Sequence, residues 1–152
     1  MEERTLVLIK PDAMEKQLAG NIISELYSLN LKMIGLKLIN VKRELAETHY
    51  NKLKEEKGEK IFEGTIKHLM GELHGNENVV AIVYQGENAI QKIRDFIGET
   101  NPEKAKPNSI RGKYGRIIQD KDLFETVIHA SDSKESAERE ISLWFKKDEL
   151  VD

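Results

Sequence analysis

The chain has 152 residues, with 24 lysines and arginines against 27 aspartates and glutamates, so its formal net charge is −3. This length fits one domain over residues 1–152, and the lack of cysteine excludes a disulfide scaffold, a cysteine-ligated metal site and a cysteine nucleophile. The near balance of charges argues against a protein that holds nucleic acid by bulk charge. No apolar run approaches the roughly 20 residues of a membrane span, so we expect no membrane contact and a cytoplasmic location.

Hydrophobic periodicity predicts four strands separated by helices. Continuous or alternating apolar residues are typical of strands, and apolar residues three and four apart are typical of helices. Lys10-Pro11 stops the first apolar run, because proline cannot continue a strand ladder. The predicted elements, in chain order, are a buried strand over residues 5–9, a helix over 19–30, a half-buried strand over 32–41, helices over 44–54 and 61–70 with the EEKGEK segment between them as an exposed turn, a strand over 78–85, a helix over 88–97, a short strand at 127–128 and a last helix from 133.

Local signals place helix ends and one long loop. Asn88 is expected to cap the helix that follows it, with Gly98 just past its end, and Asp132 and Glu135 have the spacing of a capping box. From Gly98 to Lys121 the chain is irregular, which is typical of a functional loop. The order of elements predicts a ferredoxin-like α+β sandwich of the βαββαβ type, in which helices pack on an antiparallel four-stranded sheet. This fold hosts many functions, so the function has to be argued from side chains.

Three of the four histidines carry no functional signal. His49 and His68 lie in amphipathic helical stretches, where a partly exposed position without function is the prediction. His74 lies in a turn rich in glycine and asparagine, and no function is predicted for it either. The spacing of His68 and His74 matches no usual zinc site, so no metal site is predicted from them.

His129 is a stronger candidate for chemistry. It ends a short apolar run and is followed by small residues in a tight turn, although a histidine satisfied by the hydroxyls of that turn is an equally good interpretation. Glu140 lies on the flank of the apolar face of the last helix, where a carboxylate is costly to bury without a partner. A chain that folds back would bring this carboxylate to the imidazole and fix the tautomer that a nucleophilic histidine needs. A solvated charge at the helix edge is the alternative.

Several catalytic patterns are missing from the sequence. Ser131 and Asp132 are too close to His129 to form a hydrolase triad, and there is no G-x-S-x-G, Walker or G-x-G-x-x-G pattern. A bound phosphate would therefore need cations rather than a glycine loop. Lysine and arginine side chains suit that task, although each of the candidates alone is more simply a solvated charge. The candidate cations are Lys10, Arg94 and Arg111.

These residues lie in segments that resemble the nucleoside diphosphate kinase family. Five family motifs occur in the family's order over about residues 4–151, which makes the resemblance highly specific. The segments are residues 5–13 (TLVLIKPDA), 98–102 (GETNP), 109–112 (SIRG), 129–133 (HASDS) and 136–145 (SAEREISLWF).

The resemblance implies a ping-pong transfer of phosphate between nucleotides by one nucleoside diphosphate kinase-like domain. His129 would accept the γ-phosphate of a nucleoside triphosphate as a pros-phosphohistidine and pass it to a nucleoside diphosphate. Ser131 and Glu140 match the positions that support the imidazole. In the family Mg²⁺ bridges nucleotide phosphates, so Mg²⁺ is expected as the cofactor without a direct protein ligand. The positions that hold phosphates or ribose near the histidine are matched by Lys10, Tyr50, Arg94, Thr100 and Arg111.

The sequence departs from the family where the ribose and base bind. Thr126 stands where the family usually has an asparagine that contacts the ribose, so a weaker ribose contact is expected. Ile61, with Phe62 beside it, takes the place of a stacking phenylalanine, and Leu123 takes that of the other apolar base contact. The resemblance also implies a homo-oligomer, a hexamer rather than a tetramer, because the loop around Pro102 is the family's usual hexamer contact.

Two other hypotheses stay open at this point. One is a ferredoxin-like regulatory module that binds a nucleotide without turnover, motivated by Thr126 and by extra residues around 71–78 and 117–122. The other is nucleic-acid binding, which has weaker support. The chain is acidic, and its third predicted strand lacks the aromatic run of an RNA-recognition motif.

Overall fold

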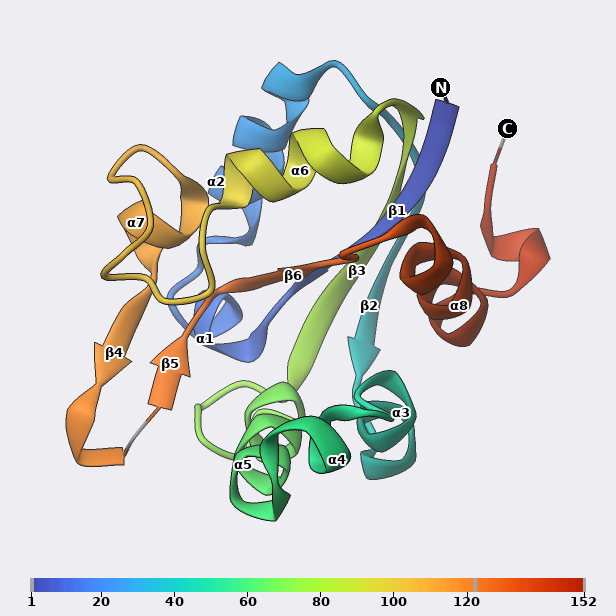
Figure 1. Ribbon diagram of the computed structural model, residues 1–152. Helices are drawn as coiled ribbons and strands as arrows, with labels where there is room; N and C mark the ends of the chain where they lie inside the picture. Colours follow the sequence, from blue (N-terminus) through green and yellow to red (C-terminus); the bar gives the residue numbers. More distant parts are fainter. Residues whose placement is uncertain (1, 122, 152) are drawn as a thin grey trace.

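The computed structural model describes residues 2–121 and 123–151. Its centre is an antiparallel sheet with the strand order β2-β3-β1-β6, which confirms the predicted ferredoxin-like sandwich (Figure 1). The strands of this sheet are β1 (Glu2–Ile9), β2 (Lys32–Asn40), β3 (Asn78–Glu87) and β6 (Ile128–Ala130). A separate hairpin pairs β4 (Arg116–Ile118) with β5 (Leu123–Glu125).

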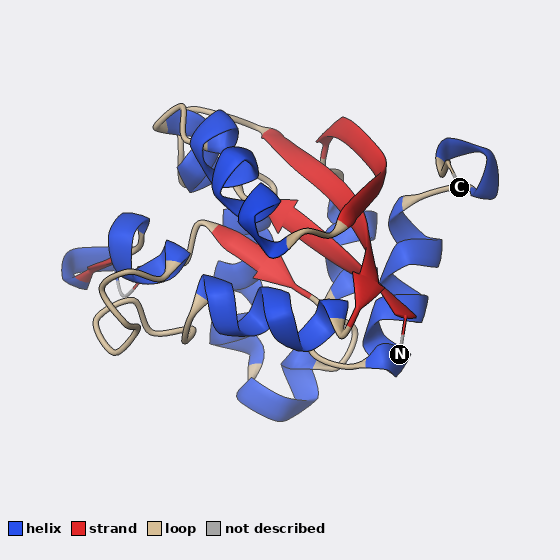
Figure 2. Ribbon diagram, turned by 90° about the horizontal axis from the view of Figure 1, so that it is seen from above, coloured by secondary structure: helices blue, strands red, loops and turns tan. Residues whose placement is uncertain are grey.

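Helices cover both faces of the sheet (Figure 2). One face carries α2 and α6, and the other carries α3, α5 and α8. The α-helices are α1 (Pro11–Glu15), α2 (Ala19–Leu26), α3 (Arg43–His49), α4 (Leu53–Lys57), α5 (Glu59–Leu69), α6 (Ala89–Ile97), α7 (Ile110–Tyr114) and α8 (Lys134–Trp144). Short 3₁₀ turns are η1 (Tyr27–Leu29), η2 (Gln119–Lys121) and η3 (Lys147–Glu149).

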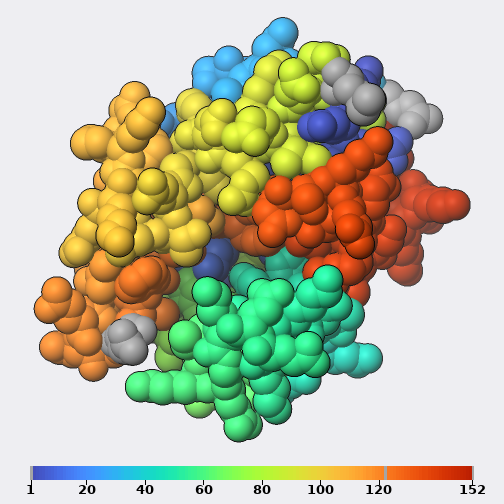
Figure 3. Space-filling model, in the orientation of Figure 1, coloured from blue at the N-terminus to red at the C-terminus, as the bar shows by residue number. Residues whose placement is uncertain are grey.

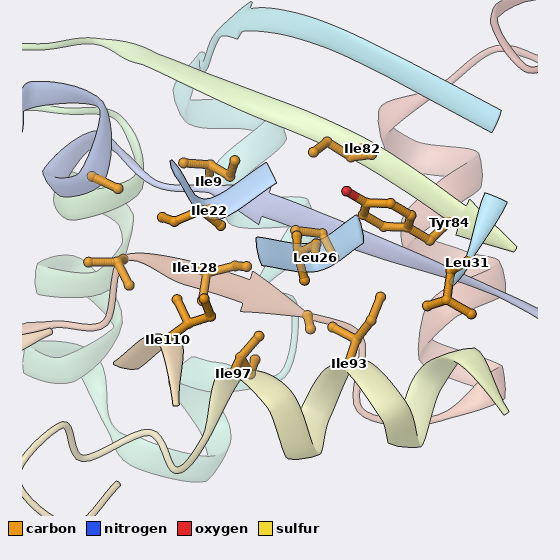
Figure 4. Packing of buried hydrophobic residues seen from close by; sticks show 14 of the residues in the cluster. Ile9, Ile22, Leu26, Leu31, Ile82, Tyr84, Ile93, Ile97, Ile110 and Ile128 are labelled. Atoms are coloured by element: carbon orange, nitrogen blue, oxygen red, sulfur yellow. The ribbon is translucent and has the colours of Figure 1, made fainter. Parts of the chain in front are cut away.

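Strand β1 is buried on both of its faces, which explains its continuous apolar sequence. Val7 and Ile9 belong to the core under α2 and α6, part of which Figure 4 shows. Leu6 and Leu8 belong to the core under α5 and α8. Each of these side chains is fully buried, and burial of one such side chain stabilises the fold by about 1.5–3 kcal/mol. The strand therefore holds the two layers together, and its end at Ile9 fixes the position of the residues that follow.

The predicted turn between residues 54 and 61 is wrong. Most of the EEKGEK segment is helical, because lysine and glutamate are good helix formers, and it is divided between α4 and α5. Gly58 separates the two helices with a φ of 90°, a conformation that a side chain would disfavour. The chain thus changes direction at a single residue.

Asn88 is the N-cap residue of α6 and Gly98 its C-cap, as predicted. Asn88 nevertheless has left-handed backbone angles and makes no side-chain cap, and the Glu3 carboxylate instead accepts a hydrogen bond from the Ile90 amide at 3.1 Å. The predicted capping box at Asp132 is wrong by one residue. Ser133 is the N-cap of α8, and its hydroxyl accepts from the Ser136 amide.

The segment predicted as a loop from 98 to 121 contains α7, β4 and η2, so it is more ordered than its composition indicates. Ser109 caps α7 by accepting from the Gly112 amide at 3.1 Å. The short strand expected at 127–128 begins one residue later, at Ile128. Among the described residues, no helix is long and apolar enough to cross a bilayer.

Candidate active site

His129 lies on β6, opposite Leu8 of β1, and its side chain is partly exposed. Its Nε2 atom is 2.8 Å from Oε1 of Glu140, which α8 carries back over the sheet. Ser131 donates its hydroxyl proton to the same carboxylate oxygen at 2.9 Å. The Ser131 hydroxyl in turn accepts from the Leu6 amide at 3.2 Å, so β1 fixes its position.

This arrangement sets the tautomer of His129. An ionised carboxylate only accepts hydrogen bonds, so the ring proton lies on Nε2 and Nδ1 keeps its lone pair. Glu140 is buried, and the two donors balance much of the cost of burying its charge. The outcome is a histidine whose Nδ1 is available as a nucleophile.

His49 packs against His129, and its predicted partly exposed position is wrong. The two ring centroids are 4.5 Å apart in an edge-to-face contact. Trp144 donates from Nε1 to Nδ1 of His49 at 3.0 Å, so the proton of the His49 ring lies on Nε2. Burial, with a contribution from His129, lowers the pKa of His49 to about 2, and the ring is neutral at pH 7.

Tyr50, the next residue, also faces this group. Its ring centroid is 6.4 Å from that of His129. Burial raises the pKa of Tyr50 to about 12, so its hydroxyl keeps its proton at pH 7 and can donate a hydrogen bond.

Two buried cations converge on residues 126–128, directly before His129. Lys10 donates from Nζ to the Thr126 hydroxyl at 2.9 Å. Arg111 uses three of its donors on backbone carbonyls, at distances of 2.7 Å to Ile128, 3.0 Å to Gly98 and 3.3 Å to Thr126. The guanidinium has five N–H groups, so others stay available for an anion.

Burial lowers the pKa of both cations. It lowers the pKa of Lys10 to about 8, with Asp12 opposing the change, and the pKa of Arg111 to about 10. Both groups are therefore charged at pH 7. Desolvated positive charge at this place favours a multiply charged anion.

The turn at residues 126–128, to which these cations donate, is strained. The Ile128 amide donates to the Thr126 carbonyl at 2.6 Å, and Val127 between them has a φ of 57°. This is the rare form of γ-turn, and it is uncommon for a β-branched residue. The Asp12 carboxylate accepts from the Val127 amide at 3.0 Å, and the Val127 carbonyl accepts from the Lys10 amide at 2.9 Å. Sequence patterns did not indicate Asp12, because its role depends on a contact across 115 residues.

The remaining predicted residues lie around this centre. Arg94 and Thr100 are exposed, and the charge of Arg94 lowers the pKa of Arg111, which places the two within electrostatic reach. Leu123 on β5 is partly buried. Figure 3 shows a hollow between the green surface of α4 and α5 and the yellow and orange surface of residues after α6, with N-terminal atoms in blue at its floor.

Not every predicted nucleotide contact has a free side chain. Phe62 is 9% exposed and packs in the core under α5, whereas Ile61 is 52% exposed. Thr126 is buried and its hydroxyl accepts from Lys10, so the side chain for which a weaker ribose contact is predicted supports a cation in this structure.

A second cluster of ionisable groups lies behind the turn, where the sequence predicted none. The side chains of His68 and His74 are buried, and their ring centroids are 5.0 Å apart. His74 contacts Glu125 at 2.5 Å, while His68 lies 3.3 Å from Asp12. The predicted partly exposed position of His68 is wrong, while no position was predicted for the side chain of His74. Each side chain turns inward to a carboxylate that precedes or supports the strained turn.

Comparisons with known proteins give matches over nearly the whole chain. A sequence model of the family described as Nucleoside diphosphate kinase matches residues 3–150. A nucleoside diphosphate kinase of Pyrococcus furiosus is 47% identical over 99% of this chain and 87% of its own length. One of Carboxydothermus hydrogenoformans is 45% identical over 98% of this chain and 91% of its own length.

Solved structures agree with the sequence comparisons. A transition-state mimic of the nucleoside diphosphate kinase from Borrelia burgdorferi, with bound vanadate and ADP, has a TM-score of 0.90 at 30% identity. The match covers 99% of this chain and 91% of that one. The enzyme from Halobacterium salinarum in complex with CDP has a TM-score of 0.87 at 36% identity, over 100% of this chain and 93% of that one.

A histidine oriented by a carboxylate beside buried cations, on a ferredoxin-like sheet, is typical of an enzyme that transfers a group from an anionic substrate. Together with the comparisons, these features define a phosphotransferase. The chain belongs to the nucleoside diphosphate kinase family, as its sequence motifs predicted.

Proposed function

We propose that this enzyme transfers the γ-phosphate of a nucleoside triphosphate to a nucleoside diphosphate through a phosphohistidine on His129. The observation that carries the proposal is the contact between Nε2 of His129 and Glu140, which leaves the Nδ1 lone pair for attack. The relative from Borrelia burgdorferi, a transition-state mimic with bound vanadate and ADP, supports phosphoryl transfer as the reaction.

The chemistry balances in two half-reactions. In the first, the Nδ1 lone pair of His129 attacks the γ-phosphorus, and the bond to the β–γ bridging oxygen breaks, releasing the diphosphate. In the second, a terminal oxygen of another diphosphate attacks the same phosphorus, and the P–N bond returns its electron pair to Nδ1. The proton stays on Nε2 in both half-reactions, where Glu140 accepts its hydrogen bond. The carboxylate also stabilises the positive charge that develops on the ring.

The cations would bind and orient the phosphates. Lys10 and Arg111 lie closest to the turn before His129, and Arg94 adds charge from the surface. Because phosphoryl transfer has a loose transition state, positioning and charge stabilisation provide most of the catalysis. Tyr50 and Thr100 would donate hydrogen bonds to phosphate or ribose oxygens. Ile61, Phe62, Leu123 and Thr126 are the proposed neighbours of base and ribose, and loose contacts there favour broad base selectivity.

Mg²⁺ is proposed as a partner of the nucleotide rather than of side chains. Among the described residues, the group that could hold an ion is His49, His129 and Glu140. This set fits Mg²⁺ poorly, because Mg²⁺ prefers oxygen ligands, and the proton of His49 Nε2 is fixed by Trp144. Phosphate oxygens would supply the preferred ligands, and Mg²⁺ bound to them would neutralise part of their charge.

Labelling with [γ-³²P]ATP and Mg²⁺ tests the proposal. The protein should acquire an acid-labile, alkali-stable phosphate, and a second diphosphate should remove it. His129→Ala should lose the label, while His74→Gln, which replaces another buried histidine, should keep it. An unlabelled wild type, or a labelled His129→Ala, would overturn the proposal. Binding of ADP without any exchange would instead favour the regulatory-module hypothesis.

We further propose that the chain works as one domain and forms a homo-oligomer in the cytoplasm, a hexamer rather than a tetramer. Leu36 and Leu38 support self-association, since they are 54% and 62% exposed on β2, an edge strand of the sheet. Exposed apolar side chains on an edge strand favour contact with another chain. Cell fractionation tests the location.

A further inference from the structure

The buried pair of Asp12 and His68 lies behind the strained turn. Asp12, on α1, is completely buried, and its Oδ2 atom accepts from the Val127 amide at 3.0 Å. Its other oxygen, Oδ1, is 3.3 Å from Nε2 of His68 on α5. The contact is not aligned as a hydrogen bond, and neither atom has another partner in the part of the chain that is described. Among the described residues, Oδ1 of Asp12 and Nε2 of His68 are therefore each other's available polar partner.

The turn that Asp12 holds also receives both buried cations. Lys10 donates to the Thr126 side chain, and Arg111 donates to the carbonyls on both sides of Val127. A shift of the Asp12 carboxylate away from the Val127 amide would therefore release the turn and move the atoms that fix the two cations. Because Val127 has unfavourable backbone angles, the turn needs such an external contact.

Lys10 lies near enough to the same carboxylate for their charges to interact. It lies two positions before Asp12. Burial lowers the pKa of Lys10 and the charge of Asp12 opposes that fall, while the charge of Lys10 helps to lower the pKa of Asp12. An Asp12 carboxylate that turned to the Lys10 ammonium would neutralise a cation that the nucleotide needs. The contact with His68 favours the orientation in which Asp12 faces Val127.

We propose that His68 is a positioning residue for nucleotide binding, which acts through Asp12 by holding its carboxylate on the Val127 amide and away from Lys10. The inference rests on the proposed function, because it assigns His68 to the phosphate-binding side of that site. His68 touches no reacting atom in this scheme, so nucleotide affinity depends on it more than the chemical step does.

His74 provides a matched control in the same cluster. It is a buried histidine beside a carboxylate as well, but its partner is Glu125, which Lys16 and Arg116 also bind. Loss of His74 leaves Glu125 with two cations, whereas loss of His68 leaves Oδ1 of Asp12 with none. We therefore expect His74→Gln to bind nucleotide within about threefold of the wild type.

The test compares His68→Leu with His68→Gln, whose amide nitrogen can take the place of Nε2. His68→Leu should raise KM and the Kd for ADP at least tenfold, with kcat within threefold of the wild type, and His68→Gln should restore both. Thermal melts followed by circular dichroism check that the variants fold. Equal Kd values for His68→Leu and the wild type would overturn the inference, as would a loss of kcat in parallel with stability at unchanged KM.

A double-mutant cycle asks whether His68 acts through Asp12. Asn at position 12 keeps an acceptor for Val127 and has no charge for Lys10 to attract. In the Asp12→Asn background, His68→Leu should change Kd less than twofold. A tenfold effect there would show a route other than Asp12 and overturn the proposal. Since Kd is measured calorimetrically without turnover, a wild type that binds ADP but does not exchange phosphate would refute the proposed function alone.

Discussion

Glu140 shows how much of this site depends on one buried side chain. Its Oε1 accepts from both His129 and Ser131. Glu140→Ala would leave both without an acceptor, and the loss of a charged hydrogen bond costs about 1.5–3 kcal/mol, or roughly 10- to 150-fold in kcat/KM. Steady-state kinetics checks this, with Glu138→Ala, an exposed glutamate on the same helix, as the control. Equal kcat/KM for the two variants would contradict the assigned contact.

The protonation of Lys10 should make both stability and activity depend on pH. Burial lowers its pKa from the ordinary 10.5 to about 8, so the folded chain binds this proton less tightly than the unfolded chain does. The charged form therefore costs stability below pH 8, and that cost is relieved as pH rises from about 8 to about 10.5. For activity we expect the opposite sign, because deprotonation of Lys10 would remove a charge that is proposed to bind phosphate.

We expect kcat/KM to fall as pH rises through about 8. Tyr50, with a pKa of about 12, keeps its proton in this range, and Arg111, with a pKa of about 10, keeps its charge longer than Lys10. A pH profile of kcat/KM from 6.5 to 10 tests this. In Lys10→Gln the overall rate should be lower and the alkaline fall should be absent, and persistence of that fall would assign it to another group.

At the scale of elements, α7 matters because it carries Arg111. A Cβ on Gly112 would overlap the carbonyl oxygen of Lys106, so Gly112→Ala must displace α7 or the loop before it. Overpacking of this kind costs about 1–3 kcal/mol. Urea unfolding and the KM for nucleotide should both report the change. Gly20→Ala on α2, where a Cβ meets nothing within 4 Å, should be neutral or slightly stabilising; similar losses in both variants would argue against a steric cause.

Elements with a regular apolar pattern could be predicted from the sequence, because burial of one face or both faces determines them. β1 and α6 are examples, with ends within a few residues of the predicted ones. The pairing of Glu140 with His129 could also be anticipated, since a carboxylate on an apolar flank needs a partner.

The rest depends on contacts between distant segments, which periodicity does not encode. The left-handed Val127 is held by Asp12 and Lys10, so nothing in its own sequence indicates the turn. His49 lies on an ordinary amphipathic helix, and its burial follows from Trp144, 95 residues away. A histidine on such a helix can be exposed or buried, and only the packing of α8 decides between them.

At the scale of the whole molecule, the open edge of the sheet predicts assembly. Leu36 and Leu38 share one face of β2, and a charge placed there should oppose burial against another chain. Leu38→Glu should lower the mass measured by light scattering, whereas Lys32→Glu, an exposed polar position on the same strand, should not. A monomeric wild type would contradict the proposed hexamer, and an unchanged mass in Leu38→Glu would place the contact elsewhere.

The burial of β1 on both faces has a consequence for local opening. Val7 and Leu8 lie between β3 and β6, so their amide hydrogens should exchange with solvent only through global unfolding. α4, which has no buried residue, should exchange through small fluctuations. Because His129 pairs with Leu8, we expect the proposed nucleophile to lie in a slowly exchanging part of the chain, and α4, beside the hollow, to exchange faster.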